Sequence, residues 1–329
     1  MKNVLEIFSG SGGMALGFEK AGFHHTLLND NNKDCCSTLR TNRPHWNVIE
    51  SDVRNFDFKP YSDKVDVVAG GFPCQSFSYA GNKKGFEDPR GSLFWEYSRV
   101  VNETKPLVAL AENVKGLLTH DGGQTLKTMM GVMQMVGYDN VFCEVLNAVE
   151  HGVPQKRERL IMAWVRRNVH KHTPKPFAIG KSDKILTLRD ALKGVPASEG
   201  AKYPDGKAHV LSMVPPGGCW RDLPHEVAKA YMGASWTQVG GKTGMARRMS
   251  WGEPSLTILT TASQKQTERC HPDETRPFTV RESARIQTFP DDWDFDGSLS
   301  SQYRQIGNAV PVEMSHRIAN AVKDFLKGL

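Results

Sequence analysis

Short apolar runs alternate with longer amphipathic stretches through the first half of the chain. Runs at residues 3–8, 24–30, 46–52, 65–71 and 106–113 are typical of β-strands, and stretches such as 34–41 and 92–101 are typical of the helices between them. Runs such as residues 65–69 are mainly apolar, as expected for strands that are covered on both faces. The pattern predicts an α/β fold with a Rossmann-like, mostly parallel sheet between layers of helices.

Two further features extend this prediction. Apolar runs at residues 140–148 and 159–167 follow one another after a short connection, which indicates an antiparallel pair at one sheet edge. After about residue 170 the regular alternation ends, and a stretch rich in Pro, Gly and basic residues predicts a smaller irregular domain. Pro311 then opens an amphipathic helix, which we expect to pack on the first domain. The predicted domains are 1–170 with 300–329, and 171–299.

Composition narrows the class only slightly. The 329 residues are 39% hydrophobic and 24% charged, which is ordinary for a globular protein. No apolar run approaches the ~20 residues of a membrane span, and residues 1–10 enter a strand without a leader pattern. We therefore expect an intracellular protein. The net charge of +6 is compatible with a polyanionic partner but is weak support for one.

One of the six cysteines stands apart from the others. No two form a CxxC pair, which disfavours both a zinc site and a disulfide framework. Cys74 comes between Pro73 and Gln75, directly after a predicted buried strand, where a polar, glycine-punctuated loop begins. A cysteine at the end of a strand, next to such a loop, indicates a nucleophile.

A glycine-rich turn follows the first predicted strand. Gly10, Gly12 and Gly13 fit a permissive form of the dinucleotide-binding fingerprint, and Asp30 ends the next strand, close to the expected spacing. Asp52, at the end of the third strand, would be the next carboxylate along the same sheet edge. These residues indicate a ligand of the adenosine type. On their own they leave open an NAD-dependent oxidoreductase, or a turn followed by a capping aspartate.

Several short motifs occur in one order along nearly the whole chain, and together they closely resemble the C5-cytosine DNA methyltransferase family. They are Phe-x-Gly-x-Gly-Gly at residues 8–13, Pro-Cys-Gln at 73–75, Glu-Asn-Val at 112–114, Gln-x-Arg-x-Arg at 155–159, "RESARIQTFPDDW" at 281–293 and Gly-Asn at 307–308. The resemblance implies an enzyme that methylates C5 of cytosine with S-adenosylmethionine, leaving S-adenosylhomocysteine and using no metal.

The resemblance also implies roles for the reactive residues. Cys74 would add to cytosine C6 and turn C5 into a nucleophile, because a thiolate is both a soft nucleophile and a competent leaving group. Glu112 would contact N3 and the exocyclic amine. Arg157 would place a positive charge near O2, and Arg159 is the second basic residue of that motif. The base that removes the C5 proton is not identified, and water is one candidate.

Cofactor residues follow from the same motifs. Three of the motifs and two strand ends supply the residues expected at the methyl donor, namely Phe8, Gly10, Gly12, Gly13, Asp30, Asp52, Pro73 and Asn308. The chain departs from the family at Asn31-Asn32, where an aromatic that packs on adenine is frequent. This departure affects the local adenine packing that we expect.

The target base must rotate out of a duplex before its C6 can be attacked. We expect the loop after Cys74 and the region 171–299, as a target-recognition domain and hinge, to hold double-stranded DNA. The candidate contacts are Gln75, Ser78, Lys83, Lys84, Arg90, Arg221, Lys242, Arg247, Arg248 and Thr257. The less favoured alternative for this loop is a solvated surface excursion.

A single recognition region suggests a short site, as in a restriction–modification system, and a monomer is expected to suffice. A cognate restriction endonuclease is a possible member of that system, without direct contact. The expected location is the bacterial cytoplasm, at the nucleoid when the protein is bound to DNA. Two alternatives on the same scaffold remain, a tRNA cytosine-5 methyltransferase and a non-catalytic DNA-binding regulator.

Overall fold

The structure is a computed structural model that describes residues 2–73, 93–170, 177–240 and 242–328. Contacts divide the chain into two units. The first holds Met1–His151, Glu158–Ser182 and Val310–Leu329, and the second holds Gly152–Arg157 and Asp183–Ala309.

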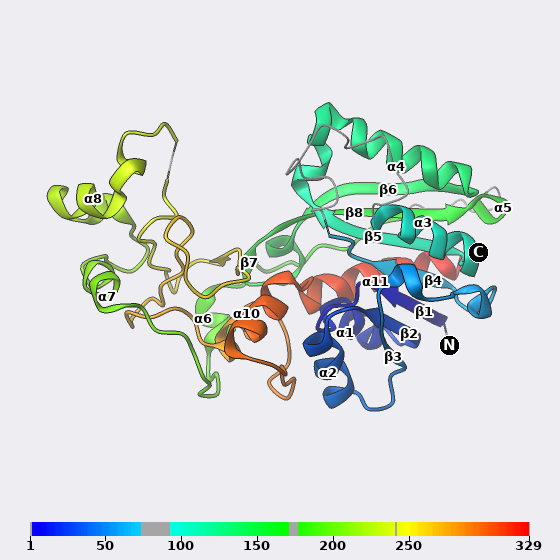
Figure 1. Ribbon diagram of the computed structural model, residues 1–329, viewed down its shortest axis with the longest axis horizontal. Helices are drawn as coiled ribbons and strands as arrows, with labels where there is room; N and C mark the ends of the chain where they lie inside the picture. Colours follow the sequence, from blue (N-terminus) through cyan, green and yellow to red (C-terminus); the bar gives the residue numbers. More distant parts are fainter. Residues whose placement is uncertain (1, 74–92, 171–176, 241, 329) are drawn as a thin grey trace. The chain divides into compact units, whose positions relative to one another are not determined.

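A seven-stranded sheet forms the centre of the first unit (Figure 1). Its strands, in spatial order, are β3 (Val48–Glu50), β2 (Phe23–Asp30), β1 (Lys2–Ile7), β4 (Val67–Gly70), β5 (Val108–Val114), β8 (Glu158–Arg166) and β6 (Tyr138–Asn147). Neighbours from β3 to β5 are parallel, whereas β8 is antiparallel to both β5 and β6. The predicted α/β class, mostly parallel sheet and antiparallel edge pair are confirmed.

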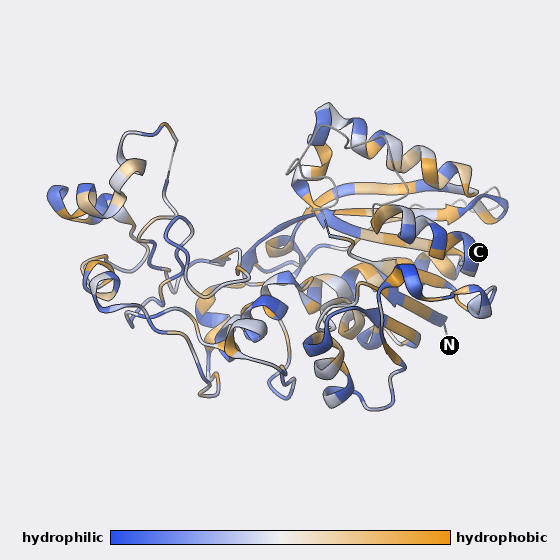
Figure 2. Cartoon of the chain, in the orientation of Figure 1, coloured by the Kyte–Doolittle hydropathy of each residue, from blue (hydrophilic) through white to orange (hydrophobic). Residues whose placement is uncertain are grey.

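Helices cover this sheet. They are α1 (Gly13–Lys20), α2 (Lys33–Asn42), α3 (Leu93–Thr104), α4 (Gln124–Met135), the short α5 (Arg167–His170) and α11 (Val312–Leu326). Single 3₁₀ turns lie between them at Val53–Asn55, Lys59–Tyr61, Lys115–Leu118, His120–Gly123 and Ala148–His151. Strands and helices both contribute apolar residues to the core of this unit, and the orange colouring is visible on the strands (Figure 2). Trp164 and Tyr97 are the largest apolar side chains in that core that are fully buried.

The last helix returns to the first unit, as its sequence predicted. Helix α11 packs on α1 (Figure 1). At Gly17 a Cβ atom would come within 2.4 Å of the Ser315 Cβ, so the two helices approach too closely for any side chain at that position. The apolar face of α11 is buried along its length, at Met314, Ile318, Ala321, Val322 and Phe325.

The second unit is irregular, as expected. Its helices are α6 (Leu188–Leu192), α7 (Asp205–Ser212), α8 (His225–Met232), α9 (Val280–Ile286) and α10 (Leu299–Asn308), with 3₁₀ turns at Trp220–Asp222 and Gly233–Trp236. Its only described sheet pairs β7 (Gln155–Lys156) with β9 (Ser255–Leu256), in parallel. A small core fills it, made of Tyr203, Leu211, Val214, Leu223, Ala228, Ala246 and Cys270.

The contacts place three segments differently from the domain bounds that we expected. Residues 152–157 and 300–309 belong to the second unit, the first unit extends to Ser182, and the return to the first unit begins at Val310. Tyr303 of α10 shows why, because its hydroxyl donates to the Phe278 carbonyl at 2.7 Å and accepts from the Ala201 amide at 3.1 Å. Among the described residues, no helix is long and apolar enough to cross a membrane.

Candidate active site

The turn after β1 is built for close approach to a ligand. Phe8, Gly10 and Gly12 all have positive φ angles, of 56°, 53° and 91°, and α1 begins at Gly13. Glycine adopts this left-handed backbone without strain. No atom lies within 4 Å of a Cβ built at Gly10, so the backbone conformation and not crowding requires glycine there. The turn thus presents backbone amides at a helix N-terminus.

Asp30 joins this turn to the end of β2. One carboxylate oxygen accepts the Gly10 amide at 2.8 Å, and the other accepts the Asn32 amide at 2.8 Å. Burial raises the pKa of Asp30, while these backbone hydrogen bonds oppose the rise. Asn32 in turn caps α2, where its side chain accepts the Cys35 amide. The glycine turn and the carboxylate are therefore held as one structure at the carboxyl edge of the sheet.

The Asp52 carboxylate already has hydrogen-bond partners in the described structure. It caps the Val53–Asn55 turn, and its carboxylate accepts the Arg54 backbone amide at 2.9 Å and the Arg54 guanidinium at 2.7 Å and 3.0 Å. The hydrogen bonds from Arg54 lower the pKa of Asp52. The cofactor contact expected for Asp52 stays a prediction, in competition with this cap.

Glu112 and Arg159 form an ion pair at the end of β5. The Arg159 Nε lies 2.8 Å from a Glu112 carboxylate oxygen, and the side chains are only 15% and 12% exposed. The antiparallel register of β5 and β8 brings them together, since Arg159 faces Val114 across the ladder. A Cβ at Gly71 would lie 2.8 Å from the other Glu112 oxygen. The carboxylate therefore occupies the space that the glycine leaves at the end of β4.

Asn113 fixes the backbone that leads to Cys74. Its side-chain amide donates to the Phe72 carbonyl at 2.9 Å, and its side-chain oxygen accepts the Val114 amide at 2.9 Å. The residue is 3% exposed. The Phe72 ring packs against Phe94 at a centroid distance of 5.4 Å. Asn113 was not among the site residues predicted from the sequence, although it lies inside the Glu-Asn-Val motif at residues 112–114.

Arg157 lies in the second unit and is 1% exposed. Its guanidinium donates to the carbonyls of Ile258 at 3.3 Å, Gly307 at 2.9 Å and Ala309 at 3.0 Å. These acceptors are backbone atoms of two distant segments, so Arg157 ties those segments together. This structural role differs from the charge near cytosine O2 that the resemblance implied.

Gln155 and Gln287 complete the same buried network. The two side-chain amides hydrogen-bond at 2.9 Å, Gln155 accepts the Ile258 amide at 2.9 Å, and Gln287 donates to the Ile306 carbonyl at 2.7 Å. At Gly307 a Cβ would lie 2.3 Å from the Leu259 carbonyl oxygen, so that segment requires glycine. Three of the motifs found in the sequence therefore meet inside the second unit. Asn308, expected at the cofactor, is exposed at the end of α10.

Four of the side chains expected to contact DNA in the second unit already interact within the protein. Arg248 is 3% exposed and donates to the carbonyls of Leu211, His271, Pro272 and Glu274 and to the Thr275 hydroxyl, which is a structural role and leaves no surface for DNA. The Lys242 ammonium donates to the Ser235 and Trp236 carbonyls. Arg221 lies over the Trp220 ring, and Thr257 donates to the Lys156 carbonyl at 2.8 Å.

The remaining predicted residues lie outside the described part of the chain. They are Cys74, Gln75, Ser78, Lys83, Lys84 and Arg90, while Pro73 is the last described residue before them. Among the described residues, no group of three or more His, Cys, Asp or Glu side chains could hold a metal ion.

Comparison with known proteins extends over nearly the whole chain. A sequence profile described as C-5 cytosine-specific DNA methylase matches residues 2–324. The chain is 57% identical to the type II methyltransferase M.Eco47II of Escherichia coli, over 98% of this chain and 79% of that protein. It is 49% identical to the type II methyltransferase M.Sau96I of Staphylococcus aureus, over 98% and 76%. The solved structure of the Entamoeba histolytica methyltransferase EhMeth is similar in fold, with a TM-score of 0.70 at 16% identity over 99% of each chain.

Proposed function

Because the chain belongs to the C-5 cytosine-specific DNA methylase family, we propose that it methylates C5 of a cytosine in a short duplex DNA site, with Cys74 as the nucleophile. The observation that carries this proposal is the Glu112–Arg159 pair, which lies against Gly71 at the root of the segment that leads to Cys74. A carboxyl group and a guanidinium held in that place match the donor and acceptor edge of a pyrimidine.

The reaction needs a thiolate nucleophile, a group that holds a proton at N3 of the cytosine, and a fixed positive charge. The Cys74 sulfur forms a bond to C6, and the ring electrons move to make C5 nucleophilic while a proton is held at N3. Glu112 is the group placed to hold that proton. After the methyl group is attached, loss of the C5 proton returns an electron pair to the ring, and the bond from C6 to sulfur breaks.

We assign the stabilising charge to Arg159 and not to Arg157. Arg159 is in the first unit with Glu112 and keeps the carboxylate oriented toward one side, whereas the three carbonyls around Arg157 already use that guanidinium. A preorganised charge that needs no rearrangement during the reaction can supply several kcal/mol. Arg157 is then a positioning residue for the second unit.

S-Adenosylmethionine would supply the methyl group. The glycine turn at residues 8–13 and the Asp30 carboxylate fit the adenosine part of such a ligand, because they offer backbone amides beside an acceptor for hydroxyl groups. We include Asp52, Pro73 and Asn308 in this site on the family pattern alone.

The second unit is proposed as the target-recognition region, with a flipped-out cytosine as the substrate. The type II names of the similar proteins support a role as the modification enzyme of a restriction–modification system. We further propose that the protein acts as a monomer in the bacterial cytoplasm, without direct contact to a restriction enzyme.

Bisulfite mapping of DNA from cells that express the chain tests the proposal. A single short motif is expected to carry 5-methylcytosine, and the Cys74→Ser variant is expected to leave the same motif unmodified. A tritiated-methyl assay with tRNA and DNA in parallel separates the alternatives. Faster methylation of tRNA would favour the RNA enzyme, and absence of methylation on either, with DNA binding retained, would favour a non-catalytic regulator.

A further inference from the structure

Two short segments of the second unit lie side by side, residues 244–249 and 264–270. The Glu268 amide donates to the Gly244 carbonyl at 2.7 Å, the Cys270 amide to the Arg247 carbonyl at 3.0 Å, and the Met249 amide to the Cys270 carbonyl at 2.9 Å. Arg248 and Cys270 are partners in a parallel bridge. The two segments therefore form a short, fixed ribbon.

The two bridge partners, Arg248 and Cys270, are buried, at 3% and 0% exposed. Arg247 and Arg269 come directly before them, and the charge of Arg247 acts on Arg269. Each is half-buried. The ribbon thus holds two guanidinium groups next to each other.

Among the described residues no carboxylate forms an ion pair with either arginine, although the charge of Glu268 acts on Arg269 in the opposite sense to that of Arg247. Arg269 donates to the Thr257 carbonyl at 3.1 Å and to the Glu268 carbonyl at 2.7 Å, which sets its orientation. The Nε atom of Arg247 is buried and has no partner among the described residues. Glu268 is the carboxylate next in sequence, and it is used by Lys207 at 2.6 Å. Burial first, and the Arg247 charge second, lower the pKa of Arg269 to about 10.

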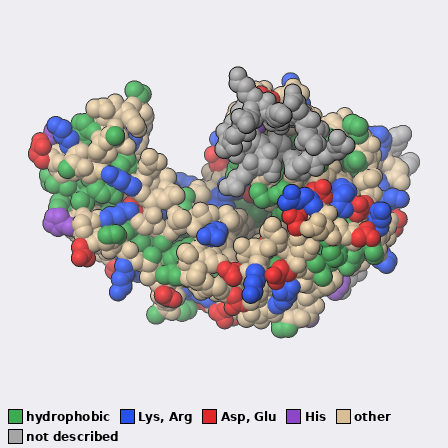
Figure 3. Space-filling view, viewed as in Figure 1, with side chains coloured by type: hydrophobic (Ala, Val, Ile, Leu, Met, Phe, Trp, Pro, Cys, Tyr) green, Lys and Arg blue, Asp and Glu red, His purple; other side chains and the backbone are tan. Residues whose placement is uncertain are grey.

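Other arginines of this unit contrast with the pair. Arg276 forms ion pairs with Glu274 and Glu282, both at 2.8 Å. Lys and Arg side chains are elsewhere scattered over the visible face of the part that holds α7 and α8, with hydrophobic side chains between them (Figure 3). Like charges held side by side are destabilising unless an anion lies between them. The ribbon therefore maintains an unfavourable arrangement that a bound anion would relieve.

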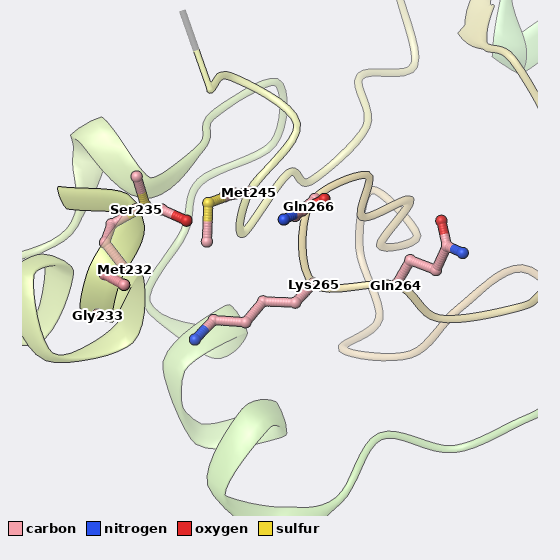
Figure 4. Close-up of a pocket in the computed structure, with 8 residues that line it drawn as sticks. Met232, Gly233, Ser235, Met245, Gln264, Lys265 and Gln266 are labelled. Atoms are coloured by element: carbon pink, nitrogen blue, oxygen red, sulfur yellow. The ribbon is translucent and has the colours of Figure 1, made fainter. Parts of the chain in front are cut away.

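A pocket borders the same ribbon. It has a volume of about 480 Å³, and Met232 and Ser235 face Met245 and Gln266 across it (Figure 4). The one charged residue in its lining, Lys265, has its ammonium 5.1 Å from the centre of the Tyr231 ring. This pocket lacks a paired charge, so the guanidinium pair is the stronger candidate for a polyanion.

We propose that Arg247 and Arg269 together bind one phosphodiester group of the duplex DNA substrate. This inference rests on the proposed function, since it takes DNA as the substrate. The two guanidinium groups, of which Arg269 is held by backbone carbonyls, suit a phosphate oxygen pair. Such a contact orients the recognition unit on the duplex without reading its sequence. Arg269 did not stand out in the sequence, because its pairing with Arg247 depends on the ribbon.

The test measures the salt dependence of DNA binding for the intact chain. Arg247→Gln is the main variant, because this side chain makes no described hydrogen bond whose loss could disturb the fold. Arg269→Gln and the double variant accompany it. Lys229→Gln is the matched control, an exposed charge on α8 that forms no described ion pair. Fluorescence anisotropy is read with a duplex that holds the mapped site and with an unrelated duplex, from 50 to 300 mM KCl.

We expect Arg247→Gln to weaken binding about tenfold on both duplexes, as for loss of a charged hydrogen bond. The double variant should lower the slope of log K against log[salt] by about 0.9, as for one lost phosphate contact. Arg247→Lys should recover most of the affinity, since a phosphate accepts either cation. Lys229→Gln should keep the wild-type slope within the scatter of the measurement.

Two results would overturn the inference. One is wild-type affinity and slope in both single variants. The other is weaker binding on the specific duplex alone, with an unchanged slope and no recovery by lysine, which would mean that the pair reads a guanine edge. If the wild-type chain itself failed to bind DNA, the proposed function would fail before the variants were compared.

Discussion

The side-chain amide of Asn113 donates to the carbonyl of Phe72 at 2.9 Å, and this bond joins the strand that carries Glu112 to the backbone that leads to Cys74. The two residues are 41 positions apart in sequence. The bond therefore holds the end of the strand with Glu112 beside Phe72, which is among the last described residues before Cys74.

Asn113→Ala should lower kcat more than it changes DNA affinity. The Phe72 carbonyl and the Val114 amide would both lose a buried partner, and a shift of the segment by about 1 Å can cost about 100-fold in rate. Single-turnover methylation together with DNA binding measures this split. Asn140→Ala is the control, because Asn140 also donates to two carbonyls, at 2.9 Å and 3.1 Å, but on β6. Equal losses of kcat in both variants would contradict a positioning role for Asn113.

Substitution of the two arginines in the Gln-x-Arg-x-Arg motif should have different effects, one on the rate and the other on stability. Arg159→Gln is expected to reduce kcat by about 10²–10³, as for loss of one preorganised donor, with little change in melting temperature. Arg157→Gln is expected to cost about 3 kcal/mol of stability, because three buried carbonyls lose a charged donor. Urea unfolding beside single-turnover rates separates the two effects. An Arg157 variant that was fully stable but inactive would mean that Arg157, and not Arg159, supplies the stabilising charge.

Gly17→Ala should destabilise the first unit. The new methyl group would lie 2.4 Å from the Ser315 Cβ and 2.6 Å from the His316 amide nitrogen, so α11 would have to move. Overpacking of this kind costs about 1–3 kcal/mol. Gly131→Ala is the control, since that glycine is also inside a helix but has no atom within 4 Å of its Cβ position, and alanine there should stabilise by about 0.5–1 kcal/mol. Thermal unfolding of both variants checks the sign of each change.

Acid should destabilise the protein through His25. Burial lowers the pKa of His25 from 6.5 to about 3, so the unfolded chain binds a proton between these values that the folded chain does not. Stability should therefore fall as the pH drops below about 6.5, by about 2 kcal/mol at pH 5. Neighbouring Glu6 has a pKa raised by burial, so its contribution has the opposite sign and is lost as the pH rises above 4.5.

Urea titrations at pH 7.5 and pH 5.0 on the wild type and His25→Leu isolate the histidine contribution. The leucine variant should lose less stability between these two pH values than the wild type. An identical loss in both proteins would assign the acid sensitivity to other groups.

Much of the fold and part of the site followed from local sequence pattern. The parallel strands were predicted because apolar runs of strand length are a local signal, and Asp30 and Glu112 were found because each ends such a run. Arg157 and Arg159 could not be told apart, since their different surroundings come from segments 100 to 150 residues away. The same holds for Arg247 and Arg248, where only the bridge to Cys270 decides which of two adjacent arginines faces inward.

The return of α11 to the first unit also bears on synthesis by the ribosome. Residues 183–309 build the second unit and are made before α11, yet α11 covers α1, which is among the first helices made. A nascent chain therefore exposes the Gly17 face of α1 until residues 312–326 have been made. The first unit is completed only after the second unit has emerged.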